Sequence, residues 1–107
     1  MSKNTFNERC YELLKLIPEG KVTTYKEMAN ALNTKAWRAV GSAMAKNKFL
    51  YTIPCHRVVR SDGSIGQYAL GEDKKMDILI KEGVTVTNGK VKDLEKFMHK
   101  FSSSKAT

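Results

Sequence analysis

Apolar residues recur at helical spacing at the start of the chain. Between Thr5 and Ile17 they occupy positions 6, 10, 13, 14 and 17, which fall on one face of a helix. A Pro-Glu-Gly sequence at 18–20 then interrupts the pattern. We therefore predict an amphipathic helix from Thr5 to Ile17, with Cys10 packed on its buried face.

Two shorter helical patterns follow, separated by only a few residues. Thr24 and Glu27 have the spacing of a capping box, so a helix is expected from Tyr25 to Leu32. After a polar break, Thr34 is a candidate N-cap for a second helix from Lys35 to Lys46. Two helices joined in this way are typical of a helix-turn-helix, although ordinary helical hairpins share the pattern.

Beyond these helices the pattern indicates a small β element. A short buried strand is expected from Cys55 to Arg60, followed by a polar loop from Ser61 to Gly66. A further helix is expected from Gly71 to Lys81, ended by Gly83. Its inward-facing apolar residues are expected to be Met76, Leu79 and Ile80. The lysines of this region are expected to form a solvated face: Lys74, Lys75, Lys90, Lys92 and Lys96.

The last part of the chain predicts a hairpin and a short helix. Residues alternate around an Asn-Gly turn from Val84 to Val91, which is a strong hairpin pattern. A final helix is expected from Leu94 to Phe101, and a disordered tail from Ser102 to Thr107. Together these elements predict a mostly α fold with a small β element, as in a winged helix-turn-helix DNA-binding domain.

Composition fits one small domain with a polyanionic partner. The 107 residues suit a single domain over 1–107, and no apolar run approaches the roughly 18 residues of a membrane span. A net charge of +8 favours DNA or RNA as a partner, although charge alone does not decide it. The two cysteines lie far apart and lack metal-ligand spacing, so we expect free thiols, no metal and a cytoplasmic protein (nuclear in a eukaryote).

The second helix of the helix-turn-helix is rich in small residues. These are Ala36, Ala39, Gly41, Ser42, Ala43 and Ala45. Glycine at position 41 costs about 1 kcal/mol of helix stability relative to alanine, so its presence calls for a reason. Close packing against another helix and close approach to a bound surface both explain it. Trp37, in the same helix, is expected in the core or at its boundary.

A cysteine followed by histidine is the strongest chemical signal in the chain. Pro54 restricts the backbone before Cys55 and can hold the thiol at a defined place. An imidazole near a cysteine can give it thiolate character, as His56 would do here. Arg57 is expected to form a structural ion pair. Neighbouring side chains often point apart, so the dipeptide alone does not establish catalysis.

This run and four others resemble one family, the O6-alkylguanine-DNA alkyltransferases, also called methylated-DNA–protein-cysteine methyltransferases. The matching stretches, in order along the chain, are Thr24 to Ala29, Arg38 to Asn47, Pro54 to Val58, Asp62 to Gly71, and Glu82-Gly83. They cover roughly residues 20–84. The match is with the family's catalytic domain, and the separate N-terminal domain that many members carry is expected to be absent.

The resemblance implies a DNA repair reaction that each molecule performs once. Cys55 would accept the alkyl group from O6-alkylguanine in DNA, with His56 acting as a base through a bound water and Glu82 orienting its imidazole. This relay is expected to lower the thiol pKa below its free value of about 8.5. The thioether product has no route back to the thiol, and the reaction would need no metal or donor cofactor.

The same resemblance assigns a base pocket and a DNA-binding helix. Tyr25 would donate to a ring nitrogen, Ala69 would donate its backbone amide to the departing oxygen, and Val58 would offer backbone groups to guanine. The other implied pocket residues are Met44, Asn47 and Tyr68. Arg38 would fill the stack left by a flipped nucleotide, with its helix in the minor groove of double-stranded DNA. The other implied DNA contacts are Thr24, Ala36, Ala39, Gly41 and Ser42.

Two other functions compete with this interpretation. A non-catalytic alkyltransferase-like lesion sensor would share the DNA-binding helices, but such proteins usually carry tryptophan at the position of Cys55. A transcriptional regulator would need a two-fold dimer, and no dimerisation segment is apparent, so a monomer is expected. The chain also has Lys48 and Leu70 where relatives often have proline and glycine, which affects the expected shape of the pocket.

Overall fold

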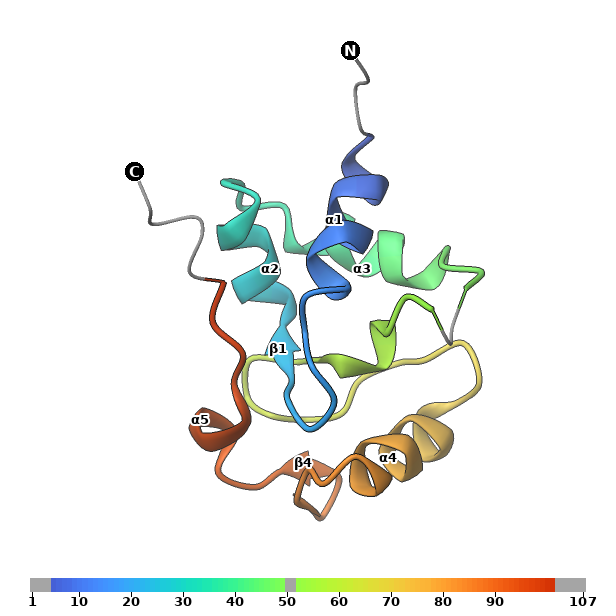
Figure 1. Cartoon of the computed structure of the whole chain (residues 1–107), viewed down its shortest axis with the longest axis vertical. Helices are drawn as coiled ribbons and strands as arrows, with labels where there is room; N and C mark the ends of the chain where they lie inside the picture. Colours follow the sequence, from blue (N-terminus) through green and yellow to red (C-terminus); the bar gives the residue numbers. More distant parts are fainter. Residues whose placement is uncertain (1–4, 50–51, 102–107) are drawn as a thin grey trace.

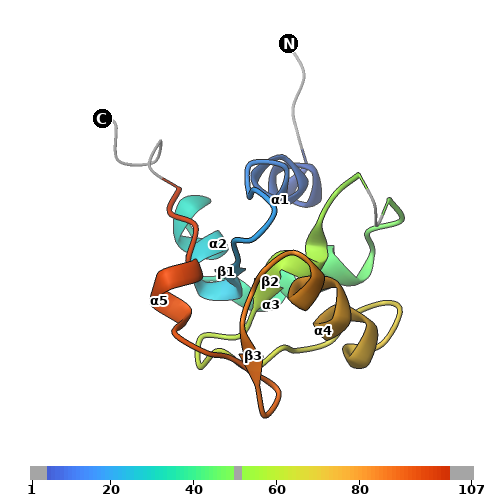
Figure 2. The same cartoon turned by 60° about the horizontal axis from the view of Figure 1, so that its bottom comes forward.

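The fold is mostly helical and has two short pairs of strands. The computed structural model describes residues 5–49 and 52–101, so the predicted disordered tail at 102–107 lies outside the described residues. The helices are α1 (Phe6–Leu14), α2 (Tyr25–Ala31), α3 (Trp37–Ala45), the 3-10 helix η1 (Cys55–Arg57), α4 (Glu72–Lys81) and α5 (Leu94–Phe97). The strands are β1 (Thr23–Thr24), β2 (Val58–Val59), β3 (Val86–Thr87) and β4 (Lys90–Val91). Helices α1, α2 and α3 lie on one side of the β1–β2 pair, and α4, α5 and the hairpin lie on the other (Figures 1 and 2).

Helix α1 begins with a complete capping box. The Thr5 hydroxyl accepts the amide of Glu8 at 3.1 Å, and the Glu8 carboxylate accepts the amide of Thr5 at 2.9 Å. The helix ends at Leu14, before the predicted Ile17, because the amides of Leu16 and Ile17 bond only three residues back. Cys10, Leu14 and Ile17 are buried as expected.

The predicted helix-turn-helix is formed by α2 and α3. The Thr24 hydroxyl accepts the amide of Glu27 at 3.0 Å, which starts α2 where the sequence places it. Helix α3 begins at Trp37 and not at Lys35. The Thr34 hydroxyl instead accepts the amide of Ala36 at 3.2 Å, and this local turn holds Ala36 outside helical geometry.

Strand β2 joins two hydrophobic clusters. It pairs in parallel with β1, with Thr23 opposite Val58 and Thr24 opposite Val59. Because successive side chains of a strand point to opposite faces, Val58 packs in the cluster of α1, α2 and α3, and Val59 in a second cluster with Leu79. The predicted strand at Cys55 to Arg60 is therefore only partly right, since its first three residues form η1.

The hairpin of β3 and β4 forms the predicted wing. Asn88 and Gly89 both have positive φ, 54° and 74°, as a two-residue turn between twisted strands requires. The helix predicted from Leu94 to Phe101 is too long, because α5 ends at Phe97. The chain then extends, and the His99 amide donates to the Val22 carbonyl at 2.7 Å, so pairing along β1 replaces the last helical turn.

Helix α4 has the predicted extent but a different inward face. Leu79 is fully buried as expected, whereas Ile80 is 49% exposed and Met76 is only partly buried. The residue that shares the buried face with Leu79, one turn earlier, is Lys75. Lys75 was predicted to be solvated and is 0% exposed, so that prediction is wrong.

Candidate active site

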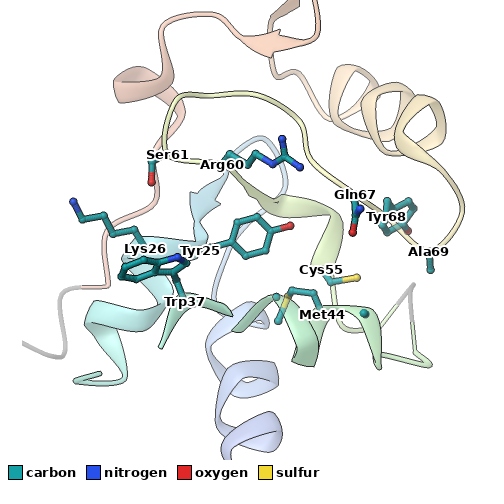
Figure 3. Close-up of a pocket in the computed structure, with 12 residues that line it drawn as sticks. Tyr25, Lys26, Trp37, Met44, Cys55, Arg60, Ser61, Gln67, Tyr68 and Ala69 are labelled. Atoms are coloured by element: carbon teal, nitrogen blue, oxygen red, sulfur yellow. The ribbon is translucent and has the colours of Figure 1, made fainter. Parts of the chain in front are cut away.

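A pocket of about 780 Å³ opens between the helix-turn-helix and the loop that follows β2 (Figure 3). Its volume is in the range of small-molecule sites. Helices α2 and α3 form one wall, the loop at residues 67–69 forms the opposite wall, and Cys55 lies between them. The lining residues are Tyr25, Lys26, Trp37, Gly41, Met44, Ala45, Cys55, Arg60, Ser61, Gln67, Tyr68 and Ala69.

Cys55 is held by a tight turn at the base of this pocket. Its amide donates to the Ile53 carbonyl at 2.8 Å, and Pro54 between them has φ −80° and ψ 67°. The cysteine then starts η1 and is 5% exposed. The thiol is therefore fixed in place and meets solvent only through the pocket.

Asn47 anchors the segment before the cysteine. Its side-chain amide donates to the Ile53 carbonyl at 2.9 Å, and its carbonyl oxygen accepts the Phe49 amide at 2.9 Å. Asn47 is buried and is not among the residues that line the pocket. Its side chain also forms a hydrogen bond that favours the Cys55 thiolate.

Burial dominates the ionisation of the thiol. It raises the pKa of Cys55 above the ordinary value, while the hydrogen bond from Asn47 and the positive charge of Lys75 act in the opposite direction. The predicted lowering of the thiol pKa is thus wrong for the protein without DNA. Desolvation outweighs the groups that favour the thiolate, and the side chain is held mainly as the thiol.

His56 is positioned as a neutral base. Its Nε2 lies 2.9 Å from Glu82 Oε2. An ionised carboxylate only accepts hydrogen bonds, so Nε2 carries the proton and Nδ1 the lone pair. Burial lowers the pKa of His56 below its ordinary value, although the hydrogen bond and charge of Glu82 oppose this, so the imidazole is neutral at neutral pH. In the described part of the chain, Nδ1 is buried and has no hydrogen-bond partner.

Arg57 pairs with the same carboxylate, as the sequence predicted. Its Nε donates to Glu82 Oε1 at 2.9 Å and its Nη2 donates to Oε2 at 2.7 Å, while Nη1 donates to the Ile17 carbonyl at 2.7 Å. Burial opposes ionisation of Glu82, but the hydrogen bonds from Arg57 and His56 prevail and hold its pKa below the ordinary value. Glu82 therefore ties the end of α4 to η1, and Arg57 links η1 to the turn after α1.

The pocket contains four of the predicted base-pocket residues. Tyr25 and Met44 line it from the helix-turn-helix, and Tyr68 and Ala69 line it from the loop (Figure 3). Val58 is fully buried in β2 and does not line it. Gln67, in the matched stretch from Asp62 to Gly71, also lines it, and the lining residues that the sequence did not assign include Lys26, Arg60 and Ser61. Leu70, the departure from the family pattern, is 48% exposed and outside the pocket lining.

The exposed face of α3 and the residue before the helix carry three of the six predicted DNA contacts, and Ala39 and Gly41 are partly buried. Ala36, Arg38 and Ser42 are exposed. A side chain at Gly41 would meet nothing within 4 Å, so packing inside the chain does not require glycine there. Trp37 is 54% exposed and lines the pocket, which contradicts its predicted place in the core or at its boundary. Thr24 is almost fully buried and caps α2, so the structure does not place it on this face.

The described residues reveal neither a metal cluster nor a membrane-spanning segment. Among residues 5–49 and 52–101, no group of three or more histidine, cysteine or acidic side chains could hold a metal ion. No helix in the same part of the chain is long and apolar enough to cross a bilayer.

The fold and the site together define a winged helix-turn-helix domain with a buried cysteine facing its pocket. Residues 5–84 match the family described as "6-O-methylguanine DNA methyltransferase, DNA binding domain", and the chain belongs to that family.

Named relatives include two curated proteins and one solved structure. The chain is 45% identical over 96 residues to a bifunctional methyltransferase/endonuclease of Picrophilus torridus, covering 88% of this chain and 32% of that protein. It is 48% identical over 80 residues to a methylated-DNA–protein-cysteine methyltransferase of Thermococcus kodakarensis, covering 74% and 45%. The structure of S. pombe Atl1 in complex with damaged DNA containing O6-carboxymethylguanine matches with a TM-score of 0.80 and 32% identity, over 94% of this chain and 99% of that chain. The chain spans roughly a third to a half of the length of the two curated relatives.

Proposed function

We propose that this protein repairs DNA by transferring the alkyl group of O6-alkylguanine irreversibly to Cys55, once per molecule. The observation that carries the proposal is a cysteine, 5% exposed, at the base of a pocket between a helix-turn-helix and a loop, followed directly by a neutral His56 bonded to Glu82. A helix-turn-helix supplies the DNA contact, and a thiol with a base beside it supplies the nucleophile.

The reaction is a displacement at the alkyl carbon. His56 takes the thiol proton through a bridging water, using the lone pair of Nδ1, and the Glu82 carboxylate stabilises the resulting imidazolium. The thiolate attacks the alkyl carbon, so a sulfur–carbon bond forms as the carbon–oxygen bond to guanine breaks. The bonding electrons go to guanine, which takes up a proton and becomes ordinary guanine. The alkyl group comes from DNA, so no donor cofactor is needed.

Groups on both walls of the pocket support the departing base. Burial raises the pKa of Tyr25, so its hydroxyl keeps its proton and can donate to a ring nitrogen. The Ala69 amide, on the opposite wall, would donate to the oxygen as negative charge develops there. Val58 would contribute only through its backbone, because its side chain is buried in the core.

The target base must leave the duplex to reach a thiol at this depth. Flipping costs a few kcal/mol of unstacking, and Arg38, exposed in the first turn of α3, would fill the vacated position. The open surface at Gly41 allows α3 to approach the floor of the minor groove closely. The net charge of +8 would favour phosphate contacts that do not depend on sequence.

Intact-mass measurement after incubation with a duplex containing one O6-methylguanine tests the proposal. We expect a gain of one methylene per chain, located on the Cys55 peptide and saturating at one equivalent. Cys55→Ser should abolish the gain and keep DNA binding, because the hydroxyl preserves the shape of the site but is a far weaker nucleophile. Wild-type protein that shows no mass change with this duplex would refute the transfer.

A lesion sensor is the second candidate function. Atl1, whose solved structure holds damaged DNA, matches nearly its whole length to this chain. A sensor would bind the lesion duplex selectively and leave its alkyl group in place, so the same mass measurement separates the two functions. The intact Cys55, His56 and Glu82 arrangement favours transfer.

We also propose that the protein acts as a monomer in the cytoplasm, or in the nucleus of a eukaryote. One recognition helix per flipped base suffices for this reaction, so two-fold symmetry brings no advantage. Cys55 must remain a free thiol to react, which suits a reducing compartment.

A further inference from the structure

Lys75 is buried in a way that its sequence position does not explain. It is 0% exposed, while Lys74 beside it on α4 is exposed. Fully buried lysines are rare because an ammonium ion loses several kcal/mol of hydration on burial. A methionine or leucine would fill the same position without that loss. The charged group therefore calls for a role beyond packing.

The ammonium group lies directly behind the pocket wall. Nζ donates to the Gln67 carbonyl at 3.1 Å, and Gln67 belongs to the loop that faces Cys55. A side chain at Gly66 would meet both Lys75 Nζ and the Tyr25 hydroxyl at 3.5 Å, so the two polar groups converge beside this glycine. Gly66 has φ +82°, which lets the loop run close to both.

The charge of Lys75 has little compensation in the resting protein. Among the described residues, no carboxylate forms an ion pair with it. Its charged neighbours are Cys55, Glu72 on its own helix, and Arg60 after β2. Burial lowers the pKa of Lys75 to about 8, and the attraction of Cys55 and Glu72 opposes this. Of these two anionic neighbours, a Cys55 thiolate attracts the ammonium more strongly than the Glu72 carboxylate does.

We propose that Lys75 is a positioning residue whose buried ammonium stabilises the Cys55 thiolate and holds the pocket loop through the Gln67 carbonyl. It does not line the pocket, so it acts through the thiol and the loop and not on the alkylated base. Its importance for repair rests on the proposed role of Cys55 as alkyl acceptor. Its effect on thiol ionisation needs no DNA.

The test measures the rate of Cys55 alkylation by iodoacetamide between pH 6 and 10. In this reaction the thiolate sulfur bonds to the reagent's methylene carbon and iodide leaves. Quantifying the Cys55 peptide by mass spectrometry separates it from Cys10, a core thiol whose pKa burial raises to about 11. The side chains that interact with Cys55 are Asn47, Lys75, Tyr11 on α1 and Tyr25 on α2.

Three variants separate charge from packing. Lys75→Gln keeps a hydrogen-bond donor and removes the charge, Lys75→Arg keeps the charge, and Lys74→Gln removes the same charge from the exposed neighbour. We expect Lys75→Gln to raise the thiol pKa by about one unit. Alkylation of Cys55 should then be about tenfold slower near pH 7, and the rates of variant and wild type should converge at high pH. Lys74→Gln and Lys75→Arg should follow the wild-type profile closely.

A Lys75→Gln profile that coincides with those of wild type and Lys74→Gln would overturn the inference and leave Lys75 a structural residue. If Lys75→Gln does not fold, as judged by urea denaturation, Lys75→Met provides an apolar replacement for the same measurement. The result is independent of repair. If Lys75→Gln slows alkylation by iodoacetamide but the wild-type protein transfers no methyl group from DNA, only the proposed function is refuted. If the wild-type protein transfers the methyl group but Lys75→Gln leaves alkylation unchanged, only the role of Lys75 is refuted.

Discussion

Replacing Glu82 by glutamine is expected to disable Cys55 by removing the negative charge that stabilises protonated His56. The carboxylate accepts Arg57 Nε at Oε1, and both Arg57 Nη2 and His56 Nε2 at Oε2. A glutamine has one oxygen for these three donors, so in either orientation its NH₂ group faces at least one N–H of Arg57. The neutral amide also gives the imidazolium no opposing charge when His56 takes the thiol proton.

The structure also sets the expected loss of stability. Removing one partner of a buried ion pair costs about 3–5 kcal/mol, and the glutamine retains a hydrogen bond to Arg57, so we expect about 3 kcal/mol. With a urea dependence of about 1.5 kcal/mol per M, the unfolding midpoint should fall by about 2 M. The lowered pKa of Glu82 adds an acid dependence. The stabilisation that ionised Glu82 gives the folded protein is complete above the ordinary carboxyl pKa of about 4.3. It is lost as the pH falls through the lower pKa of Glu82 in the folded protein, and it is absent in the variant.

The assay combines urea denaturation at two pH values with single-turnover methyl transfer. Asp77→Asn, an exposed acid on the same helix, is the matched control and should change neither result. We expect Glu82→Gln to transfer at least about 100-fold more slowly, the usual contribution of a positioned general base. A variant that unfolds at a lower urea concentration but transfers at the wild-type rate would show that Glu82 only stabilises the fold. Wild-type values for both would refute the reasoning altogether.

Two further predictions concern the exposed face of α3. Arg38→Ala should slow repair of O6-methylguanine in duplex DNA far more than reaction with free O6-methylguanine, because only in the duplex must the position of the flipped nucleotide be filled. Equal losses on both substrates would refute this role of Arg38. Gly41→Ala should raise the free energy of unfolding by about 1 kcal/mol, since the added methyl group meets nothing within the chain, and yet weaken lesion-duplex binding in a filter or anisotropy assay. Unchanged DNA affinity would show that α3 does not approach the groove at that point.

Local patterns were enough to predict which elements form. Thr24 starts α2 and the Asn88-Gly89 turn forms the wing, because capping and turn geometry depend on residues only a few positions apart. Boundaries were less predictable where a side chain or a distant strand intervened. The Thr34 hydroxyl delays α3, and pairing of the chain after Phe97 with Val22 ends α5 early.

The site was predicted through motifs and not through local physics. His56 and Glu82 lie 26 residues apart, and only their family resemblance linked them before the structure showed a 2.9 Å contact. The ionisation of Cys55 was predicted with the wrong sign. The depth of the thiol, which sets its desolvation, depends on helices and a loop from distant parts of the chain.

The sequence by itself determined the helix-turn-helix and the wing, and it singled out Cys55 as the candidate nucleophile. Tertiary structure decided how buried each charged side chain is. The sequence of α4 predicts that Lys75 is exposed, because lysine side chains are almost always solvated. It can be buried here because the Gln67 carbonyl, eight residues away, accepts a hydrogen bond from its ammonium, and Cys55, twenty residues away, interacts with its charge in the folded protein. Such partners exist only after the chain has folded, so no periodicity along the chain reveals them.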